Sequence, residues 1–253
     1  MKNNITPKIT LVGAGPGDID LITIKGQKAI KSASVILYDA LVNEELLDLA
    51  PNSVKIFVGK RKGFKAYSQD EINRLLVDYA LQYGNVVRLK GGDSYVFGRG
   101  YEELLFTEAF DIKVEVVPGI SSSIGVPALA GIPVTHRNVS NGFYVLTGTL
   151  SNGELNPEIL ATTKINATIL ILMGLSKIQE IVEIYQKEGL GETPVAIVSN
   201  GSLPNQQSVF GTIDTIIDLA VNEKIQAPGV IVIGEVIGLK NQFNQVLSEV
   251  VAY

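Results

Sequence analysis

The sequence predicts an α/β fold of two domains, the first with a mostly parallel sheet and the second with a mixed sheet. Short runs rich in Val, Ile and Leu alternate with segments of helical periodicity, which is typical of βα units. A chain of 253 residues, 46% of them hydrophobic, can bury the cores of two such domains. The stretch 118–141 is dense in Gly, Pro, Ser and Thr and interrupts the alternation. We therefore expect domains at 1–118 and 119–253.

The apolar runs give the expected strands. In the first domain we expect strands at Lys8–Val12, Val35–Tyr38, Val54–Val58, Val86–Lys90 and Val114–Val117. In the second domain we expect them at Tyr144–Thr147, Thr168–Met173, Val195–Ser199, Gln207–Phe210 and Val230–Ile233. An extended segment that begins at Gln207 directly follows a turn, so the second sheet is expected to contain antiparallel pairs. Among the helices, one should begin after Ser68, which has capping-box spacing to Glu71, and another should run from Ser176 to Glu188 and stop at Gly189.

Composition excludes several kinds of site. The chain has no Cys and a single histidine, His136, so disulfides, thiolate chemistry and a His-rich zinc site are excluded, and no metal is expected. The net charge of −5 argues against general nucleic-acid binding. No apolar run approaches the roughly 20 residues of a membrane span, and the N-terminus carries no signal-like segment. We expect a cytoplasmic protein without a membrane or nucleic-acid partner.

A glycine-rich loop follows the first expected strand. Gly13, Gly15 and Gly17 allow close backbone approach, as in dinucleotide-binding loops. However, the last glycine of that motif would fall at Asp18, and the next helix begins only near Thr23, too far to place its N-terminus at a pyrophosphate. A nicotinamide-dependent oxidoreductase remains an alternative, and so does a tight turn whose glycines serve only the fold.

Five loops follow strands of the first domain and should share one edge of its sheet, where ligands bind in open α/β folds. For any one of them, a plain connection is the simpler interpretation. They are Gly13–Asp18, the segment at Asp39, Gly59–Arg61, Gly91–Gly100 and Pro118–Ser123.

Several strings of residues form a distinctive ordered set. They are VGAGPGD (12–18), LYDALV (37–42), VGKR (58–61), RLKGGD (88–93), VFGRG (96–100), VVPGIS (116–121) and GIPVTHR (131–137). These strings resemble those of tetrapyrrole methylases, and within that superfamily the uroporphyrinogen-III C-methyltransferases most of all. The resemblance extends from residue 9 to about residue 239, with small departures at Ser94, where the family usually has Pro, and at Ser121 and Ser122, where it has Thr-Ala.

The resemblance implies two α/β domains with the cofactor S-adenosylmethionine in the cleft between them, usually in a homodimer, with S-adenosylhomocysteine as the product. Without the resemblance, Met173 at a strand end would be interpreted as core. The cofactor contacts it implies are Pro16, Gly91, Gly92, Asp93, Val96, Ser121, Ser122, Met173 and Gly201.

The implied reaction is two successive methyl transfers to carbons of uroporphyrinogen III, through precorrin-1 to precorrin-2, an early step toward sirohaem or cobalamin. By correspondence Asp39 is the proton acceptor and Lys60 the proton donor. The alternatives are a helix N-cap or a loop hydrogen-bond acceptor for Asp39, and a solvated charge or a carboxylate anchor for Lys60. A methylase acting on a later precorrin and a non-catalytic tetrapyrrole carrier also stay open. The candidates for binding the substrate carboxylates are Arg61, Lys62, Arg99, His136 and Arg137.

Overall fold

The computed structural model describes residues 6–60 and 67–239. The chain divides into two compact units, Met1–Ser121 and Ser122–Tyr253. The division falls inside the Gly- and Pro-rich stretch, against an expected boundary after residue 118. In the described ranges, no helix has the length and apolar character needed to cross a membrane.

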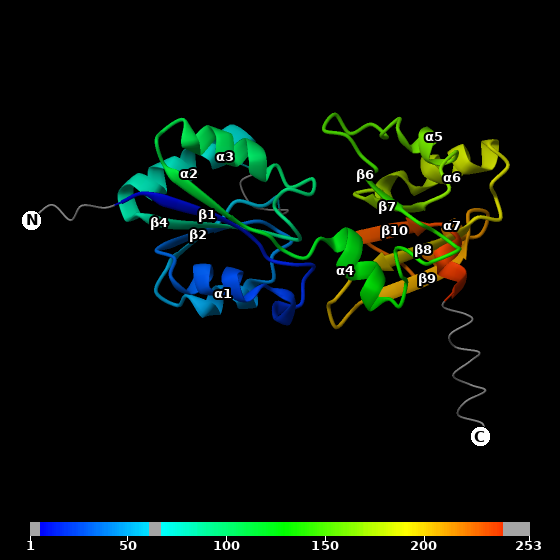
Figure 1. The fold of residues 1–253 in the computed structure, drawn as a ribbon, viewed down its shortest axis with the longest axis horizontal. Coiled ribbons are helices and arrows are strands. Elements are labelled where there is room, and N and C mark those ends of the chain that lie inside the picture. The colour runs from blue at the N-terminus through cyan, green and yellow to red at the C-terminus, as the bar shows by residue number, and fades with distance from the viewer. Residues whose placement is uncertain (1–5, 61–66, 240–253) are drawn as a thin grey trace, which may run out of the picture. The chain divides into compact units, whose positions relative to one another are not determined.

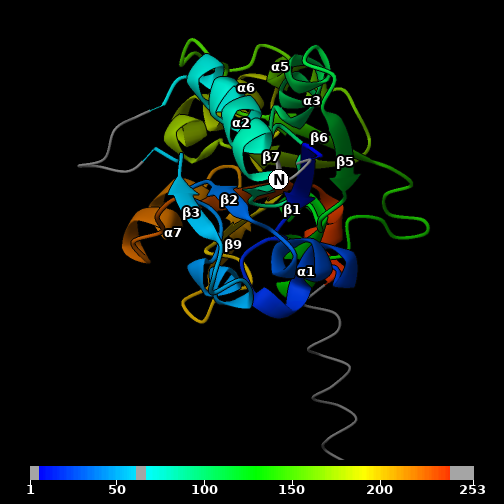
Figure 2. The ribbon, with the colours of Figure 1, turned by 90° about the vertical axis from the view of Figure 1, so that its left-hand side faces the viewer.

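The first unit is a five-stranded sheet in which every strand pair is parallel, in the order β3-β2-β4-β1-β5. Its helices cover both faces, with α2 and α3 on one and α1 on the other (Figures 1 and 2). The strands are β1 (Lys8–Gly13), β2 (Val35–Tyr38), β3 (Val54–Phe57), β4 (Asn85–Lys90) and β5 (Lys113–Val117). The helices are α1 (Ile24–Lys31), α2 (Gln69–Tyr83) and α3 (Gly100–Glu108), with 3-10 turns at Ile19–Leu21 and Glu44–Leu49.

Alternation along the strands produces two apolar layers in this unit. Ile9 and Leu11 of β1 pack toward Leu76 of α2, whereas Val12 packs toward Ile30 of α1, and all five side chains are fully or almost fully buried. Since successive side chains of a strand point to opposite faces, one strand serves both layers. The strands predicted from apolar runs are confirmed because burial on both faces is what produces such runs.

The predicted capping box of α2 is present. The Ser68 hydroxyl accepts a hydrogen bond from the Glu71 N–H at 3.2 Å, and the Glu71 carboxylate accepts one from the Ser68 N–H at 2.8 Å. Two N–H groups that the first turn would otherwise leave unpaired are thereby satisfied.

The second unit has a mixed sheet, as predicted, in the order β6-β7-β10-β8-β9. Among its described strands only β6 and β7 pair in parallel, and the pairs of β10 with β7, β10 with β8 and β8 with β9 are antiparallel. The strands are β6 (Phe143–Thr147), β7 (Thr168–Leu172), β8 (Pro194–Ser199), β9 (Gln207–Thr212) and β10 (Gly229–Ile233). The helices are α4 (Ser122–Leu129), α5 (Ile159–Thr162), α6 (Ile178–Lys187) and α7 (Ile216–Asn222), with 3-10 turns at Leu175–Lys177 and Glu235–Gly238.

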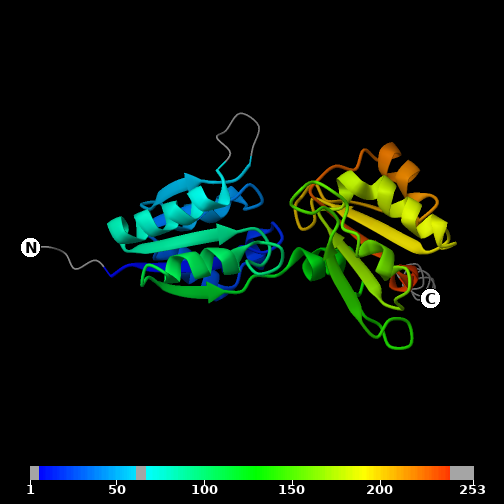
Figure 3. The ribbon, with the colours of Figure 1, turned by 90° about the horizontal axis from the view of Figure 1, so that it is seen from above.

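Both faces of the second sheet are also covered. Ile181 of α6 and Ile216 of α7 belong to one buried cluster, and Val126 of α4 and Val236 belong to the other. Figure 3 shows α6 in yellow and α7 in orange against the same side of this sheet. The helix expected over 176–188 begins two residues later, at Ile178 after a 3-10 turn, and ends before Gly189, whose φ is +74°.

Candidate functional site

The loops that follow β1 and β4 lie side by side at the carboxyl edge of the first sheet. The Gly92 N–H donates to the Gly15 carbonyl at 2.7 Å, and the Gly15 N–H donates to the Gly92 carbonyl at 3.1 Å. The Ala14 N–H donates to the Lys90 carbonyl at 2.7 Å. The Gly15–Gly92 pair is an antiparallel bridge that joins the two predicted loops just beyond the ends of the parallel strands, so the loops form one continuous surface at the carboxyl edge of the sheet.

The glycines of this surface are needed first for contacts between loops. A Cβ atom on Gly119 would lie 2.3 Å from the Gly92 carbonyl oxygen and 2.7 Å from the Gly13 Cα. A Cβ atom on Gly13 would lie 2.5 Å from the Gly119 nitrogen. Gly13 is therefore explained by the fold itself, and the interpretation of the first loop as a dinucleotide motif loses its main observation.

Asp93 joins two loops through both of its carboxylate oxygens. One oxygen accepts a hydrogen bond from the Tyr95 N–H at 2.8 Å, and the other accepts one from the Gly119 N–H at 3.0 Å. A carboxylate has about four acceptor positions, so each oxygen can accept a further bond from a ligand. The half-buried side chain combines a structural role with capacity for a ligand hydroxyl or amino group.

Asp39 is held by the backbone on both sides. Its Oδ1 accepts a hydrogen bond from the Leu41 N–H at 3.0 Å, and the Gly91 nitrogen lies 3.4 Å from each carboxylate oxygen. A Cβ atom on Gly91 would lie 2.6 Å from the Leu41 Cβ, so glycine permits the close approach of the two loops. The predicted alternative, a loop hydrogen-bond acceptor, describes Asp39 in this structure and is compatible with proton chemistry at the free lone pairs.

Lys60 lies on the loop next to Asp39. The Val58 N–H donates to the Tyr38 carbonyl at 2.9 Å, and a Cβ atom on Gly59 would lie 2.4 Å from the Ala40 nitrogen. The structure thus brings the predicted catalytic pair onto neighbouring loops, with the Lys60 side chain exposed. Arg61 and Lys62, predicted to bind substrate, lie outside the described residues.

Arg99 occurs in the left-handed backbone region, with φ +57°, at the start of α3. Its guanidinium forms a bidentate pair with Glu102, with Nε–Oε1 at 2.9 Å and Nη2–Oε2 at 2.5 Å. The hydrogen bond from Arg99 holds the pKa of the Glu102 carboxyl below its usual value. Arg99 would have to exchange this internal carboxylate for one on a substrate.

A buried ionic group that sequence analysis missed lies beneath this edge. Arg88 and Lys90 of β4 both donate to Oε1 of Glu103 on α3, at 3.1 and 3.0 Å, and all three side chains are at least 95% buried. Gln69 of α2 donates to the same oxygen at 3.2 Å and also to Asn73 at 2.9 Å. The sequence did contain a signal for this group. Arg88 and Lys90 occupy alternate positions of a strand expected to be buried on both faces, and buried cations require a buried anionic partner.

These charges affect one another. Burial by itself raises the pKa of Glu103, but the charges of Arg88 and Lys90 and the hydrogen bonds from Lys90 and Gln69 outweigh it and hold that pKa below its usual value. Burial and the nearby Arg88 lower the pKa of Lys90, an effect that Glu103 and Asp39 oppose. Glu103 Oε2 has no hydrogen-bond partner within the described ranges.

In the second unit, Met173 and Gly201 follow strands that run in the same direction, β7 and β8, because both are antiparallel to β10. Met173 is 53% exposed with φ +53°, so its interpretation as core is wrong. Its carbonyl accepts a hydrogen bond from the Thr149 hydroxyl at 2.7 Å. Gly201 is buried, and a Cβ atom there would lie 2.5 Å from Val126 of α4.

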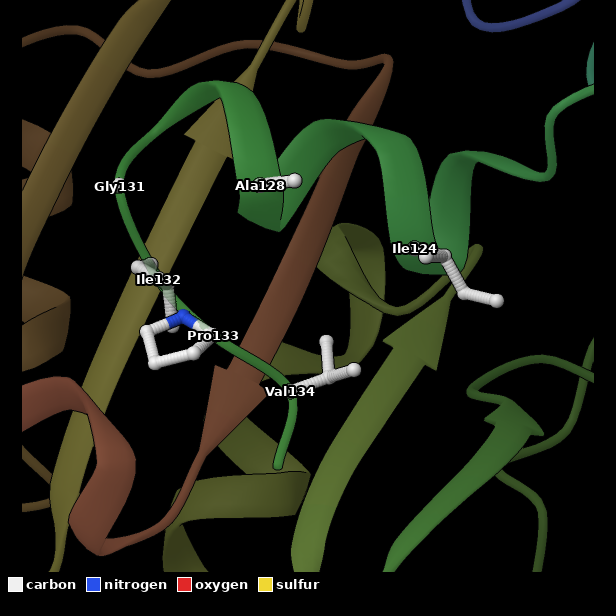
Figure 4. A pocket seen from close by; sticks show the side chains of 6 residues that line it. All are labelled: Ile124, Ala128, Gly131, Ile132, Pro133 and Val134. Atoms are coloured by element: carbon white, nitrogen blue, oxygen red, sulfur yellow. The ribbon is translucent and has the colours of Figure 1, made fainter. Parts of the chain in front are cut away.

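The remaining predicted residues divide between the two units. Pro16 and Val96 are half-buried on the loops after β1 and β4, Ser121 and Ser122 are half-buried where the units meet in sequence, and His136 and Arg137 are exposed. An apolar hollow in the second unit, between α4 and the segment from Gly131 to Val134, contains none of the predicted site residues (Figure 4). Over the described ranges, no cluster of His, Asp and Glu could hold a metal ion.

Comparison with known proteins supplies the family. Residues 8–217 match the model of the tetrapyrrole (corrin/porphyrin) methylases. The chain belongs to this family. A uroporphyrinogen-III C-methyltransferase of Methanocaldococcus jannaschii is 48% identical to this family member over 239 residues, 93% of the chain and 98% of the relative. A siroheme synthase of Actinobacillus pleuropneumoniae is also 48% identical, over 94% of the chain, which spans only 49% of that longer protein.

Solved structures give the same assignment for this methylase family member. The uroporphyrin-III C-methyl transferase of Thermus thermophilus, complexed with S-adenosylhomocysteine, matches with a TM-score of 0.80 and 36% identity over 92% of this chain and 99% of its own. A cobalt precorrin-4 methyltransferase matches with a TM-score of 0.81 and 24% identity over 91% and 95% of the two chains. The second likeness shows the fold alone.

Proposed function

We propose that this chain transfers two methyl groups in succession from S-adenosylmethionine to uroporphyrinogen III, giving precorrin-2 by way of precorrin-1. The observation that carries the proposal is a relative named uroporphyrinogen-III C-methyltransferase, which is 48% identical to this chain over 98% of the relative's own length. One of the similar solved structures is a complex with S-adenosylhomocysteine, which supports S-adenosylmethionine as the cofactor. Tetrapyrrole methylase membership replaces the nicotinamide-dependent alternative.

The described residues fit the proposed cofactor. In the first unit, Asp93 keeps acceptor positions for ribose hydroxyls or an amino group, and the half-buried Val96 is proposed as an apolar contact. In the second unit, the exposed Met173 is proposed as a further apolar contact. Gly91 has no room for a Cβ atom beside Leu41, and Gly92 has a φ of +67°, so both positions favour glycine and offer main chain alone to a ligand. Pro16, Ser121, Ser122 and Gly201 complete the proposed contacts. The bound cofactor would supply an electrophilic methyl group, which needs no metal and no covalent enzyme intermediate.

The protein's own residues would move protons and align the reactants. Asp39 is proposed as the proton acceptor, because two backbone N–H groups fix its carboxylate in place while leaving lone pairs free. Lys60, on the neighbouring loop, is proposed as the proton donor. Alignment of the cofactor's methyl carbon with the acceptor carbon of the substrate would provide much of the rate enhancement.

A carboxylate-bearing substrate needs complementary positive charge. We propose Arg61, Lys62, Arg99, His136 and Arg137 as its binding residues, because guanidinium groups bind carboxylates in bidentate fashion, as Arg99 does with Glu102. A cytoplasmic homodimer that serves sirohaem or cobalamin synthesis, with no nucleic-acid partner, completes the proposal.

The direct test is anaerobic incubation with uroporphyrinogen III and methyl-labelled S-adenosylmethionine. We expect two labels per macrocycle, and an unlabelled macrocycle would refute the proposal. A panel of later precorrins in the same assay distinguishes a sister methylase, and macrocycle binding without cofactor binding would indicate a carrier.

A second experiment tests the proton acceptor. We expect Asp39→Asn to bind S-adenosylhomocysteine with unchanged affinity and to lose at least about 100-fold in turnover, in line with the contribution of general bases. Asp78→Asn, on the exposed side of α2, is the control and should keep both properties. Unchanged turnover in Asp39→Asn would remove Asp39 from the mechanism.

A further inference from the structure

The loop between β4 and α3 holds a phenylalanine in a backbone conformation that bulky residues rarely adopt. Phe97 has a φ of +52°. Among the residues other than glycine with positive φ in the described ranges, only Phe97 and Met173 have apolar side chains, and Met173 is already proposed to contact the cofactor. A phenylalanine in this region is costly and persists only where the surrounding structure imposes the conformation.

The loop itself imposes this conformation. The Gly100 N–H donates to the Ser94 carbonyl at 3.0 Å, which closes the loop around Phe97. Cβ atoms on Gly98 and Gly100 would lie 2.7 and 2.6 Å from the same carbonyl oxygen, so the chain can fold over it only with glycine at both positions. The loop begins at Asp93, whose carboxylate is fixed by two backbone N–H groups. Phe97 is therefore held in the middle of a closed loop that starts at a proposed cofactor contact.

Packing within the fold gives little in return for this strain. The Phe97 side chain is 44% exposed and belongs to none of the buried clusters. Neighbouring aromatic side chains pair with one another, Tyr95 with Tyr101 at 6.1 Å between ring centroids and Phe106 with Phe110 at 5.4 Å. Within the described ranges, Phe97 makes no such ring contact. A strained, exposed ring beside a site indicates a function that the fold does not explain.

The neighbours of Phe97 indicate which ligand would contact it. Val96 precedes it and is a proposed cofactor contact, and Arg99 follows two residues later, exposed and also in the left-handed region. The residues proposed so far for the substrate serve the carboxylates on its rim. A porphyrinogen also has four pyrrole rings with apolar faces, and an aromatic side chain is a suitable partner for such a face.

We propose that Phe97 is a substrate-binding residue whose ring contacts the face of a pyrrole ring, while Arg99 of the same loop binds a carboxylate on the rim. The inference rests on the proposed function, because it takes a tetrapyrrole as the substrate. The closed loop fixes the backbone of Phe97 before the substrate arrives, so less ordering is left to be done on binding.

The experiment compares the wild type with Phe97→Asn in the full chain. Asparagine tolerates the left-handed region, so this variant removes the ring and relieves the backbone at the same time. Uroporphyrinogen III is titrated anaerobically into protein saturated with S-adenosylhomocysteine, which has no methyl group to transfer, so an equilibrium Kd is obtained without turnover. The KM and kcat of methyl transfer, the Kd for S-adenosylhomocysteine and thermal unfolding are measured alongside.

The ring contact predicts a selective loss of substrate affinity. We expect the uroporphyrinogen III Kd and KM of Phe97→Asn to rise about tenfold, with kcat and the S-adenosylhomocysteine Kd changed less than about threefold. Its unfolding midpoint should stay the same or rise by up to about 3 °C, because strain is removed. Phe97→Tyr keeps the ring and should bind substrate within about twofold of the wild type.

Phe110→Asn is the matched control. Phe110 is a phenyl ring of similar exposure, at 51%, but it lies before β5 and thus at the opposite edge of the parallel sheet. This variant should keep the wild-type Kd for uroporphyrinogen III. An equal loss of substrate affinity in Phe110→Asn and Phe97→Asn would overturn the inference.

The remaining outcomes separate the inference from the proposed function. If the wild type neither binds nor methylates uroporphyrinogen III, the proposed function is wrong, and the inference is wrong with it. If the wild type is active and Phe97→Asn binds substrate as tightly, the inference alone is overturned. An equal rise in the S-adenosylhomocysteine Kd would assign the ring to the cofactor and also overturn it. Should Phe97→Asn fail to fold, Phe97→Gly, which equally suits a positive φ, takes its place.

Discussion

Gly119→Ala tests whether the loops of the carboxyl edge are held together by backbone contact. The added Cβ would lie 2.3 Å from the Gly92 carbonyl oxygen, whereas ordinary contact begins at 3.4 Å, so one of the loops must move by about 1 Å. The Gly92 oxygen and the Gly13 Cα, 2.7 Å away, are both backbone atoms of hydrogen-bonded segments, and neither can swing aside as a flexible side chain would. The free energy of unfolding should fall by about 1 to 3 kcal/mol, the usual cost of overpacking.

The same displacement should reach the proposed cofactor surface. Gly119 donates to Asp93, and Gly92 lies next to it, so movement of either alters the residues proposed to hold the cofactor. We expect the midpoint of thermal unfolding to fall by about 3 to 10 °C, and the Kd for S-adenosylhomocysteine to rise at least about tenfold. Circular dichroism and titration calorimetry measure the two effects.

Gly142→Ala is the control for this variant. No atom lies within 4 Å of a Cβ built at Gly142, and neither glycine has a positive φ, so the two substitutions differ mainly in available space. The control should keep the wild-type Kd and be as stable as the wild type or slightly more stable. Equal stability and equal affinity in the two variants would refute the role of loop contact.

Two further predictions concern stability away from the edge. Hydrogen bonds from Lys25 and Lys8 lower the pKa of Glu115 to about 2, so its stabilisation is complete above about pH 4.5 and is lost as the pH falls toward 2. Glu115→Gln should therefore lower the free energy of unfolding by less than about 1 kcal/mol at pH 7, because Glu115 and its two lysine partners are partly exposed. Urea unfolding should show the difference from the wild type vanishing between pH 4.5 and 2, and a difference that stays constant would contradict this. Ser68→Ala should lower the free energy of unfolding by about 1 kcal/mol. A double-mutant cycle with Glu71→Ala should show coupling, because the two residues form reciprocal hydrogen bonds, and additive losses would argue against the capping box.

The fold was predictable because its strands are buried on both faces. The runs at β7 and β10 are apolar for that reason, and the capping-box spacing of Ser68 and Glu71 spans only four residues, so neither signal needs knowledge of distant contacts. The mixed second sheet was predictable from the turn before Gln207. The backbone requirement at Gly119 was not predictable, because it depends on a carbonyl at position 92 that becomes a neighbour only in the folded sheet.

The candidate site was predictable in position more than in detail. Loops after parallel strands meet at one edge whatever their sequence, so Asp39, Lys60 and Asp93 could be assigned to it. Their hydrogen bonds could not be assigned, because the same carboxylate can cap a turn, bind a loop or face a ligand. The burial of Lys90 also went unrecognised, since its partner Glu103 lies on a separate helix.

The position of β1 in its sheet has a consequence for biosynthesis. This strand is the first to be made, yet it lies between β4 and β5, which are the last two strands of the first unit. The nascent chain cannot bury Ile9 and Leu11 in their final environment until residue 117 has emerged from the ribosome. Most of the first unit must therefore be synthesised before β1 is protected on both edges, so its apolar side chains are open to premature association during translation.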